Sequence, residues 1–509
     1  MAEANSMKKE KSFSDVFKNF AKECAMQGIK YIPAAKFWWS RLIWIVLTLA
    51  GIGALTFHLY YIITQYYAYP VQTQVSLGFS NLQLPAITIC NTNVLRRSQL
   101  TISNSTQMEV LKKMIKQMEG NIDGQGEASL NKSSMSEDDY DYSEDYYDDG
   151  DQKHKRETGN QKFEKEKGYL QDQLFKANYM DLKKENREKA GHLIKDMIVS
   201  CSFAGRECTE KAFKLRQTAD YGNCWEFNTT NKITTRPGQI AGLTLTLNLQ
   251  NWEILGDVSE GYGARLVIHE PGTIPLPSTD GIFISSYFET NIGLRVVNVS
   301  RLGEPHSKCD DGKAFQKLYG ITYSRESCQF MCLTSTVIRR CGCYDDSREE
   351  LAMLVKVNTH QCKNKTEMAC YRKVFDDYRD KKLSCSCSCL NPCTEVGFVK
   401  TISSRPWPAD EYTGSLVKAV CNKSKEMCDI LNSYKDNRKL GYNFLKLNVY
   451  FEDLNFEKVQ ETPEITLIKL LSDVGGAIGL WIGLSAIAVC EILQLLIELC
   501  ALFIYKCCC

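Results

Sequence analysis

A long apolar stretch near the amino terminus constrains this chain more than any other feature. It runs from Ser40 to Ile62 and reads SRLIWIVLTLAGIGALTFHLYYI. A helix of this length crosses the roughly 30 Å of hydrocarbon in a bilayer. A cleaved signal peptide is the alternative, but its apolar core is normally shorter and lies nearer the first residue. We therefore predict a transmembrane helix over residues 40–62.

A second apolar segment lies near the carboxyl terminus and is longer than one straight crossing needs. It extends from about Ile465 to Tyr505 and is broken by Lys469, Asp473, Glu491 and Glu498. We predict a second span over residues 464–505. Two spans put residues 1–39 and 506–509 on one side of the membrane and residues 63–463 on the other.

Three features indicate which side of the membrane is cytoplasmic and which is extracellular. Residues 1–39 hold seven lysines against four acids, as is typical of cytoplasmic ends. Seventeen of the 23 cysteines lie between the spans, and cysteine-dense folds belong in oxidising compartments. All six Asn-x-Ser/Thr glycosylation sequons also lie there: Asn104, Asn131, Asn228, Asn298, Asn364 and Asn422. Residues 63–463 are predicted to be extracellular, with both termini cytoplasmic, in a multi-pass protein of the plasma membrane.

Composition gives no indication of nucleic-acid binding or of an enzyme. The 509 residues carry a formal net charge of +1, so no global excess of charge suggests a charged partner. The six histidines are scattered, and no His-Glu-x-x-His, Gly-x-Ser-x-Gly or phosphate-binding loop occurs. We predict a protein that is not an enzyme and that binds no metal or cofactor.

The cysteines are crowded between Cys309 and Cys393, and two chemistries fit such spacing. They could bind zinc or form disulfides, and an extracellular location strongly favours disulfides that staple the fold. Cys328 and Cys332 are one helical turn apart, which allows a helix face to be pinned to the later CSCSC run. Spacing alone does not fix the pairing.

The segment between the spans reads as an α+β domain. Alternating apolar residues predict strands over Leu243–Leu249, Ala264–Glu270 and Gly293–Val299, whereas the charged segment Gln161–Ile198 is predicted to be helical. Residues 137–151, EDDYDYSEDYYDDGD, cannot form a core and are expected to be a solvated loop. The following KHKR, ending at Arg156, could be cut by a basic-residue protease, although a charge-balanced insertion is the better interpretation.

Five motifs in order resemble the degenerin/epithelial sodium channel family, which includes acid-sensing and peptide-gated members. They are LPAITICNTN (84–93), GNCWEFN (222–228), the cysteine block, FLKLNVYFEDL (444–454) and LLSDVGGAIGLWIGLS (470–485). The resemblance covers nearly all of residues 20–500. It implies a trimeric, amiloride-sensitive, sodium-preferring channel. The extracellular domain would have a β-sheet palm, a β-ball, a finger (about 97–220), a thumb (about 302–396) and a knuckle.

The resemblance also implies a set of disulfides. The pairs are Cys90 with Cys224, Cys201 with Cys208, Cys309 with Cys393, Cys328 with Cys389, Cys332 with Cys387, Cys341 with Cys370, and Cys343 with Cys362. Cys421 and Cys428 form an additional local pair. Cys385 is left without a partner and departs from the usual family set.

The family's selectivity filter is a Gly-x-Ser triplet that interrupts the second span, and here it matches Gly483, Leu484 and Ser485. Glycine lets backbones approach the pore axis, and carbonyls freed where a helix unwinds need a wet cavity. We expect these carbonyls, with the Ser485 hydroxyl, to replace part of the hydration shell of Na⁺. The glycines alone, at 475, 479 and 483, would instead suggest tight helix packing.

Acids in the same segment favour the pore, because carboxylates at membrane depth usually face an aqueous path. Asp473 is expected at the outer mouth and Glu491 below the filter, where they concentrate cations. The resemblance places Ser472 where bulky substitutions hold family members open. It places Gly479 at the position that contacts amiloride.

Two positions depart from the family pattern and concern gating. A His-Gly pair normally precedes the first span, and this chain has Gln27 and Gly28, which keeps a tight turn available but removes the imidazole. An aromatic residue normally couples the thumb to the membrane, and His306 stands here. His306 is expected to stack on Tyr66, Tyr67 or Tyr69 or, as the plainer alternative, to be a surface residue.

These observations predict an amiloride-sensitive sodium channel opened by an extracellular ligand, with a short peptide favoured over protons. A mechanically gated or constitutively open channel of the same family is the alternative, and a non-conducting two-span receptor glycoprotein is a further one. Expected partners are related subunits in a homotrimer or heterotrimer, the lipid bilayer and amiloride as a blocker. Cys507, Cys508 and Cys509 next to the second span are candidates for acylation.

Overall fold

The computed structural model describes most of the chain, and the protein divides into two compact units. The described residues are 27–102, 106–119, 175–176, 178–256, 258–259, 261–344, 349–355, 357, 359–362, 365–380, 382–383, 389–483, 485, 490, 493–497, 499–501 and 503–504. Unit 1 comprises Met1–Gln74, Leu302–Lys308 and Gln460–Cys509. Unit 2 comprises Val75–Arg301 and Cys309–Val459.

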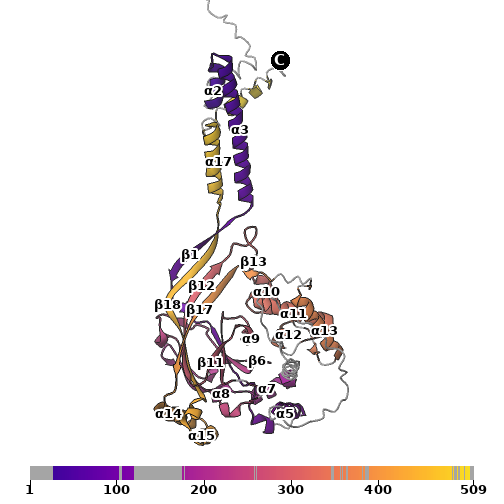
Figure 1. The fold of residues 1–509 in the computed structure, drawn as a ribbon, viewed down its shortest axis with the longest axis vertical. Helices are drawn as coiled ribbons and strands as arrows, with labels where there is room; N and C mark the ends of the chain where they lie inside the picture. Colours follow the sequence, from indigo (N-terminus) through magenta and orange to yellow (C-terminus); the bar gives the residue numbers. More distant parts are fainter. Residues whose placement is uncertain are drawn as a thin grey trace, which may run out of the picture. The chain divides into compact units, whose positions relative to one another are not determined.

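Unit 1 is built on helices. They are α2 (Gln27–Ala34), α3 (Trp38–Tyr67) and α17 (Leu467–Ile482), with α3 and α17 side by side (Figure 1). The 30 residues of α3 include the whole predicted span 40–62 and reach about 45 Å, more than a bilayer core requires. Within the described part of the chain, α3 is the one helix both long and apolar enough to cross a membrane.

The larger sheet has seven strands and shares the main hydrophobic cluster of unit 2 with a five-stranded sheet. Its order is β17 (Thr394–Pro406), β12 (Phe288–Ser300), β18 (Phe444–Pro463), β9 (Leu243–Asn248), β4 (Ile198–Phe203) and β5 (Arg206–Glu207), and β1 (Val71–Phe79) also pairs with β18. The register sets Leu445 opposite Leu247 and Leu447 opposite Leu245, and all four side chains are buried. Leucines two apart point to one face of a strand, so this alternation drives the sheet against its core.

A five-stranded sheet forms the second layer of unit 2. Its order is β11 (Ile282–Ser285), β10 (Gly263–His269), β3 (Ala86–Asn91), β7 (Gly222–Phe227) and β6 (Phe213–Thr218). All six residues of β3 are buried, as expected for a strand covered on both faces. Cys90 and Cys224 are register partners on β3 and β7 and are joined by a disulfide.

Helices and short strands complete unit 2. The helices are α4 (Gln99–Ile102), α5 (Thr106–Glu119), α7 (Lys184–Ala190), α8 (Ile194–Met197), α9 (Pro277–Asp280), α10 (Lys313–Tyr319), α11 (Arg325–Cys341), α12 (Glu349–Leu354), α13 (Lys365–Arg379), α14 (Asp410–Cys421), α15 (Lys425–Asn432) and α16 (Asn437–Gly441). The paired short strands are β2 (Leu82–Gln83) with β8 (Ile233–Thr234), β13 (Cys309–Asp310) with β16 (Asn391–Pro392), and β14 (Cys343–Tyr344) with β15 (His360–Gln361). One-turn 3₁₀ helices occupy Glu210–Ala212, Gln239–Ala241 and Asn251–Glu253.

Disulfides brace α11 at both ends, as the cysteine spacing suggested. Ser324 caps its start by accepting a hydrogen bond from the backbone N–H of Ser327, and Gly342 ends it in the left-handed conformation. Cys328 bonds to Cys389, and Cys341 to Cys370 of α13. The other bonds between described residues are Cys90–Cys224, Cys201–Cys208, Cys309–Cys393 and Cys343–Cys362, which the family resemblance implied, and Cys421–Cys428, which was expected as an additional local pair. Cys332 is also disulfide-bonded, while Cys385 and Cys387 lie outside the described residues.

The three predicted strands are confirmed as β9, β10 and β12. The prediction that residues 161–198 are helical is confirmed in part for the described residues, where α7 and α8 form. There, α7 ends at Gly191, α8 is a separate short helix, and Ile198 begins β4. A Cβ at Gly191 would lie 2.5 Å from the side chain of Asn223, so the close approach of β7 stops the helix. Residues 137–151 and Arg156 lie outside the described residues.

Candidate functional site

The expected pore segment contains a helix end where the sequence predicted an interruption. Helix α17 begins at Thr466, whose hydroxyl accepts a hydrogen bond from the backbone N–H of Lys469. It ends at Gly483, which has φ of 67° and ψ of 23° and whose N–H donates to the carbonyl of Gly479. A side chain would be strained at this φ, so glycine is the residue that allows the helix to stop here.

One face of helix α17 packs against α3, and another face, which carries the glycines, has open space beside it. Ala477 is buried, and Trp481, one turn on, donates a hydrogen bond from Nε1 to Nδ1 of His58 on α3 at 3.2 Å. A Cβ added at Gly475 or Gly479 would meet nothing within 4 Å. Two residues along a helix rotate about 200°, so the glycines face away from α3. Packing against α3 therefore does not account for the spaced glycines.

The other predicted pore residues are described in part. Ser472 and Asp473 are exposed on α17, and Ser472 lies two turns before Gly479 on the same helix face. Ser485 is exposed and non-helical. Leu484 and Glu491 lie outside the described residues.

Residues 302–308 lie against the segment that follows α3. The ring of His306 packs edge-on against Tyr69, with centroids 5.3 Å apart, and its Nδ1 is 3.3 Å from the carbonyl oxygen of Tyr69. Tyr69 packs in turn on Tyr66 and Tyr67. The predicted contact of His306 with this tyrosine group is confirmed, and Tyr69 is the partner.

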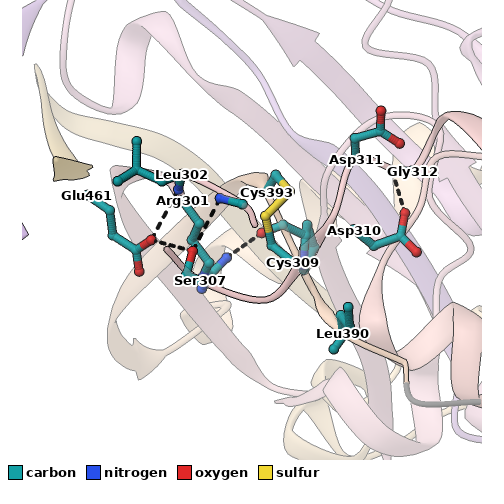
Figure 2. Close-up of a disulfide and its surroundings, with 12 residues drawn as sticks. Arg301, Leu302, Ser307, Cys309, Asp310, Asp311, Gly312, Leu390, Cys393 and Glu461 are labelled. Carbon is teal, nitrogen blue, oxygen red and sulfur yellow. Dashed lines mark hydrogen bonds between the residues drawn. A yellow bond between two sulfur atoms is a disulfide. The ribbon is translucent and has the colours of Figure 1, made fainter. Parts of the chain in front are cut away.

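The same residues also contact the strand that leads to α17. Figure 2 shows Glu461 of β18 accepting hydrogen bonds from the backbone N–H of Leu302 at 3.1 Å and from Oγ of Ser307 at 2.8 Å. Loop 302–308 is therefore in contact with the residues that follow α3 and with the strand that precedes α17.

Unit 2 contains a cavity of about 550 Å³ within the size range of small-molecule sites. Its lining mixes aromatic, charged and hydroxyl side chains, namely Thr92, Val94, Phe175, Lys176, Asp220, Tyr221, Val258, Ser259, Tyr262, Ser278, Phe283, Ile284 and Ser285, with Gly261 and Gly263. Lys176 Nζ lies 2.9 Å from Asp220 Oδ1, and Ser278 donates to Asp220 Oδ2. Burial raises the pKa of Tyr221 beside this pair.

A buried histidine supports the wall of this cavity. Asn93 lies between Thr92 and Val94 and donates from Nδ2 to Nε2 of His192 at 3.0 Å, while Nδ1 of His192 is 2.9 Å from Oε1 of Gln250. An amide NH₂ only donates, so Nε2 accepts and Nδ1 carries the proton that Gln250 receives. Burial lowers the pKa of His192 to about 4, which keeps the ring neutral.

The remaining predicted residues lie outside the pore segment, loop 302–308 and the cavity, or outside the described residues. Gln27 and Gly28 begin α2, so Gly28 lies in a helix rather than a tight turn. Asn228 and Asn422 are exposed, and Asn298 is half-buried on β12. Asn104, Asn131, Asn364 and Cys507–Cys509 lie outside the described residues.

Sequence reasoning missed the cavity and the His58–Trp481 bond. The cavity residues come from strands, a helix and loops that are far apart in the sequence, and they carry no local motif. A histidine inside an apolar span is a detectable signal, because ionisable residues at membrane depth usually have a partner or a task. The partner on α17 could not be identified from spacing.

Comparison with known proteins finds a matching family model and relatives that agree with it. The family model described as amiloride-sensitive sodium channel matches residues 20–495. Degenerin unc-8 of Caenorhabditis elegans is 31% identical over 333 residues, which is 64% of this chain and 42% of the relative. Epithelial sodium channel subunit gamma-2 of Xenopus laevis is 24% identical over 527 residues, 92% of this chain and 78% of the relative. Subunit alpha of the same channel in Neoceratodus forsteri is 24% identical over 543 residues, 96% of this chain and 80% of the relative. The matched region spans less than half the length of the degenerins.

Proposed function

Because the chain belongs to the amiloride-sensitive sodium channel family, we propose that it forms a sodium-selective cation channel whose narrowest point lies at Gly483, Leu484 and Ser485. The observation that carries the proposal is the end of α17 at Gly483, inside a membrane-length apolar segment. Backbone that leaves a helix at that depth needs water or protein partners for its carbonyls. A hydrated ion path supplies both the water and a use for the carbonyls.

The glycine face of α17 supports this pore. Ser472, Gly475 and Gly479 lie away from α3, so they are available to line an axis shared with other copies. Residues 464–505 form the second span in this proposal, with Asp473 at the outer mouth, Glu491 below the filter and amiloride at Gly479. Negative charge near a narrow path raises the local concentration of Na⁺.

We propose assembly as a trimer of this chain or with related subunits. Strand β1 supports it, because Val75, Leu77 and Phe79 alternate on one face and are 65%, 76% and 74% exposed. A row of large apolar side chains on an open strand face is typical of a surface that another chain covers. Both termini are then cytoplasmic, and glycans are attached at the exposed Asn228 and Asn422.

Opening by an extracellular ligand, with a short peptide favoured over protons, is the finer part of the proposal. The 550 Å³ cavity supports it, since it joins an ion pair to aromatic walls, and peptides present both kinds of group. Loop 302–308 would carry the movement to the membrane helices. Asp220→Asn would remove the negative charge that pairs with Lys176 and replace one of the two accepting oxygens with an NH₂ donor, so ligand sensitivity should fall while the expressed pore keeps its selectivity.

The test is current through the chain expressed alone in oocytes. We expect a sodium current blocked by amiloride, recorded across a panel of peptides and pH values with surface expression measured. Gly479→Trp should weaken amiloride block, and Gly53→Trp on a face of α3 with open space is the matched control. No current at verified surface expression would favour the non-conducting receptor. Current without any ligand would favour constitutive opening.

A further inference from the structure

Trp481 touches α3 at two points. Its indole Nε1 donates a hydrogen bond to His58 Nδ1 at 3.2 Å. Its backbone carbonyl oxygen lies where a Cβ at Gly51 would be 3.1 Å away. Gly51 and His58 are seven residues apart, or about 10 Å along the helix. The last turn of α17 is therefore held against α3 at both its backbone and its longest side chain.

Each contact has a specific chemical requirement. The indole N–H can only donate, so Nδ1 of His58 must carry a lone pair and Nε2 the proton. Leucine or phenylalanine at position 58 would offer no acceptor. At Gly51, a methyl group would press on a backbone carbonyl at a distance that few real Cβ contacts reach. The acceptor nitrogen at position 58 and the missing side chain at position 51 thus match what Trp481 presents.

Trp481 also lies close to the point where α17 ends. It is the penultimate residue of α17 and stands two positions before Gly483, where the helix ends. Ser485, the next described residue after Gly483, is no longer helical. Whatever fixes Trp481 therefore fixes where the chain turns towards Ser485.

We propose that Gly51 and His58 act as a positioning clamp on Trp481, setting the location of the Gly483 break and so the width of the constriction. The inference rests on the proposed channel function. His58 touches no permeant ion in this role and acts through Trp481. Loosening the clamp lets the constriction widen, so ions of different size are discriminated less.

A purely structural role for the same contacts predicts something else. If the His58–Trp481 bond only holds α3 and α17 together, its loss destabilises the folded channel and reduces the number of channels at the surface. The channels that remain then keep the selectivity of the wild type. The ratio of sodium to potassium permeability separates the two roles, because it does not depend on channel number.

The experiment compares reversal potentials of full-length channels carrying His58→Phe, Trp481→Phe, both substitutions together, and His58→Gln. The control is Phe57→Leu, at a neighbouring side chain that is exposed on α3. We expect each single loss of the bond to lower the sodium-to-potassium permeability ratio by about threefold to tenfold, the effect of one hydrogen bond. The double variant should be no worse than either single one, since both remove the same interaction. His58→Gln, which offers a carbonyl acceptor, should recover at least part of the selectivity.

Two results would contradict the positioning role of His58 and Gly51. Unchanged permeability ratios with reduced surface expression would overturn the clamp and leave the channel standing. Additive losses in the double variant would also overturn it. A wild-type chain that reaches the surface and carries no sodium current would instead overturn the proposed function, and the positioning role with it.

Discussion

His306 contacts Tyr69 twice, through an edge-on ring contact at 5.3 Å and through Nδ1 placed 3.3 Å from the tyrosine carbonyl oxygen. Tyr69 adopts a positive φ of 50°, which is uncommon for a residue with a side chain. The contact therefore lies where the backbone turns between α3 and β1. This is a suitable place for a loop to act on a membrane helix.

We expect His306→Ala to reduce the evoked current by about threefold to tenfold, the range for loss of an aromatic contact. His306→Trp should preserve it, because a larger aromatic ring can also pack on Tyr69. Current is to be normalised to surface expression. The control is His360→Ala, which removes an exposed histidine paired with Glu367. Equal currents from the two alanine variants would contradict a coupling role for His306.

Acid should destabilise the folded chain through His192. Burial lowers its pKa to about 4 from the ordinary 6.5, opposed by the hydrogen bond that His192 donates to Gln250 and with a smaller lowering from Arg96. Between these pH values the unfolded state binds the proton that the folded state refuses, so stability falls as pH falls from 6.5 towards 4. The full loss is about 3 kcal/mol. Thermal unfolding of His192→Gln in detergent should show a smaller loss over this pH range than the wild type. An identical pH dependence would contradict the assignment.

Glu289 on β12 should be a strongly stabilising charge. Its side chain is 4% exposed and lies 2.9 Å from Lys446 Nζ and opposite Arg405 on β17. Burial alone would raise its pKa, but the hydrogen bonds from Lys446 and Arg405 outweigh burial and lower it. Stability from this group is present above about pH 4.5 and is lost as pH falls further.

Glu289→Gln should cost about 1–3 kcal/mol, because it removes the charge that accepts hydrogen bonds from Lys446 and Arg405, while both cations keep access to water. The matched control is Asp311→Asn, whose pair with Lys313 is exposed and should matter little. Equal unfolding temperatures for the two variants would show that the network carries no net stability.

Gly222 explains one motif of the family resemblance in physical terms. It has φ of 62°, and an added Cβ would lie 2.1 Å from the carbonyl oxygen of Val94, beside the cavity. Gly222→Ala should destabilise the protein by more than the roughly 1–2 kcal/mol of backbone strain alone. Gly205 has φ of 74° with nothing within 4 Å, so Gly205→Ala measures the strain by itself. Comparable losses of stability in both variants would show that the contact with Val94 is unimportant.

The sequence predicted the features that repeat or that follow from residue chemistry. Alternating leucines located β9. The end of α17 at Gly483 was predicted from the family's Gly-x-Ser triplet, because the glycines alone suggested helix packing. The cysteine pairs required the family resemblance, because spacing leaves many connectivities open. The charged pattern over 161–198 predicted helical structure but not the break between α7 and α8, because the close approach of Asn223 to Gly191 is a tertiary contact. The cavity and the partner of His58 were missed for the same reason, because their residues meet only after folding.

The most direct test of the account is whether water and ions reach Ser485. The exposed thiols Cys490 and Cys500 are first replaced by serine, and Ser485→Cys is added to that background. A small, positively charged, membrane-impermeant thiol reagent is then applied from outside while sodium current is recorded. The account predicts that current falls irreversibly in the Ser485→Cys channel and not in its background. Full current after prolonged exposure of open channels, with the thiol still unmodified, would contradict a permeation path through the Gly483 break.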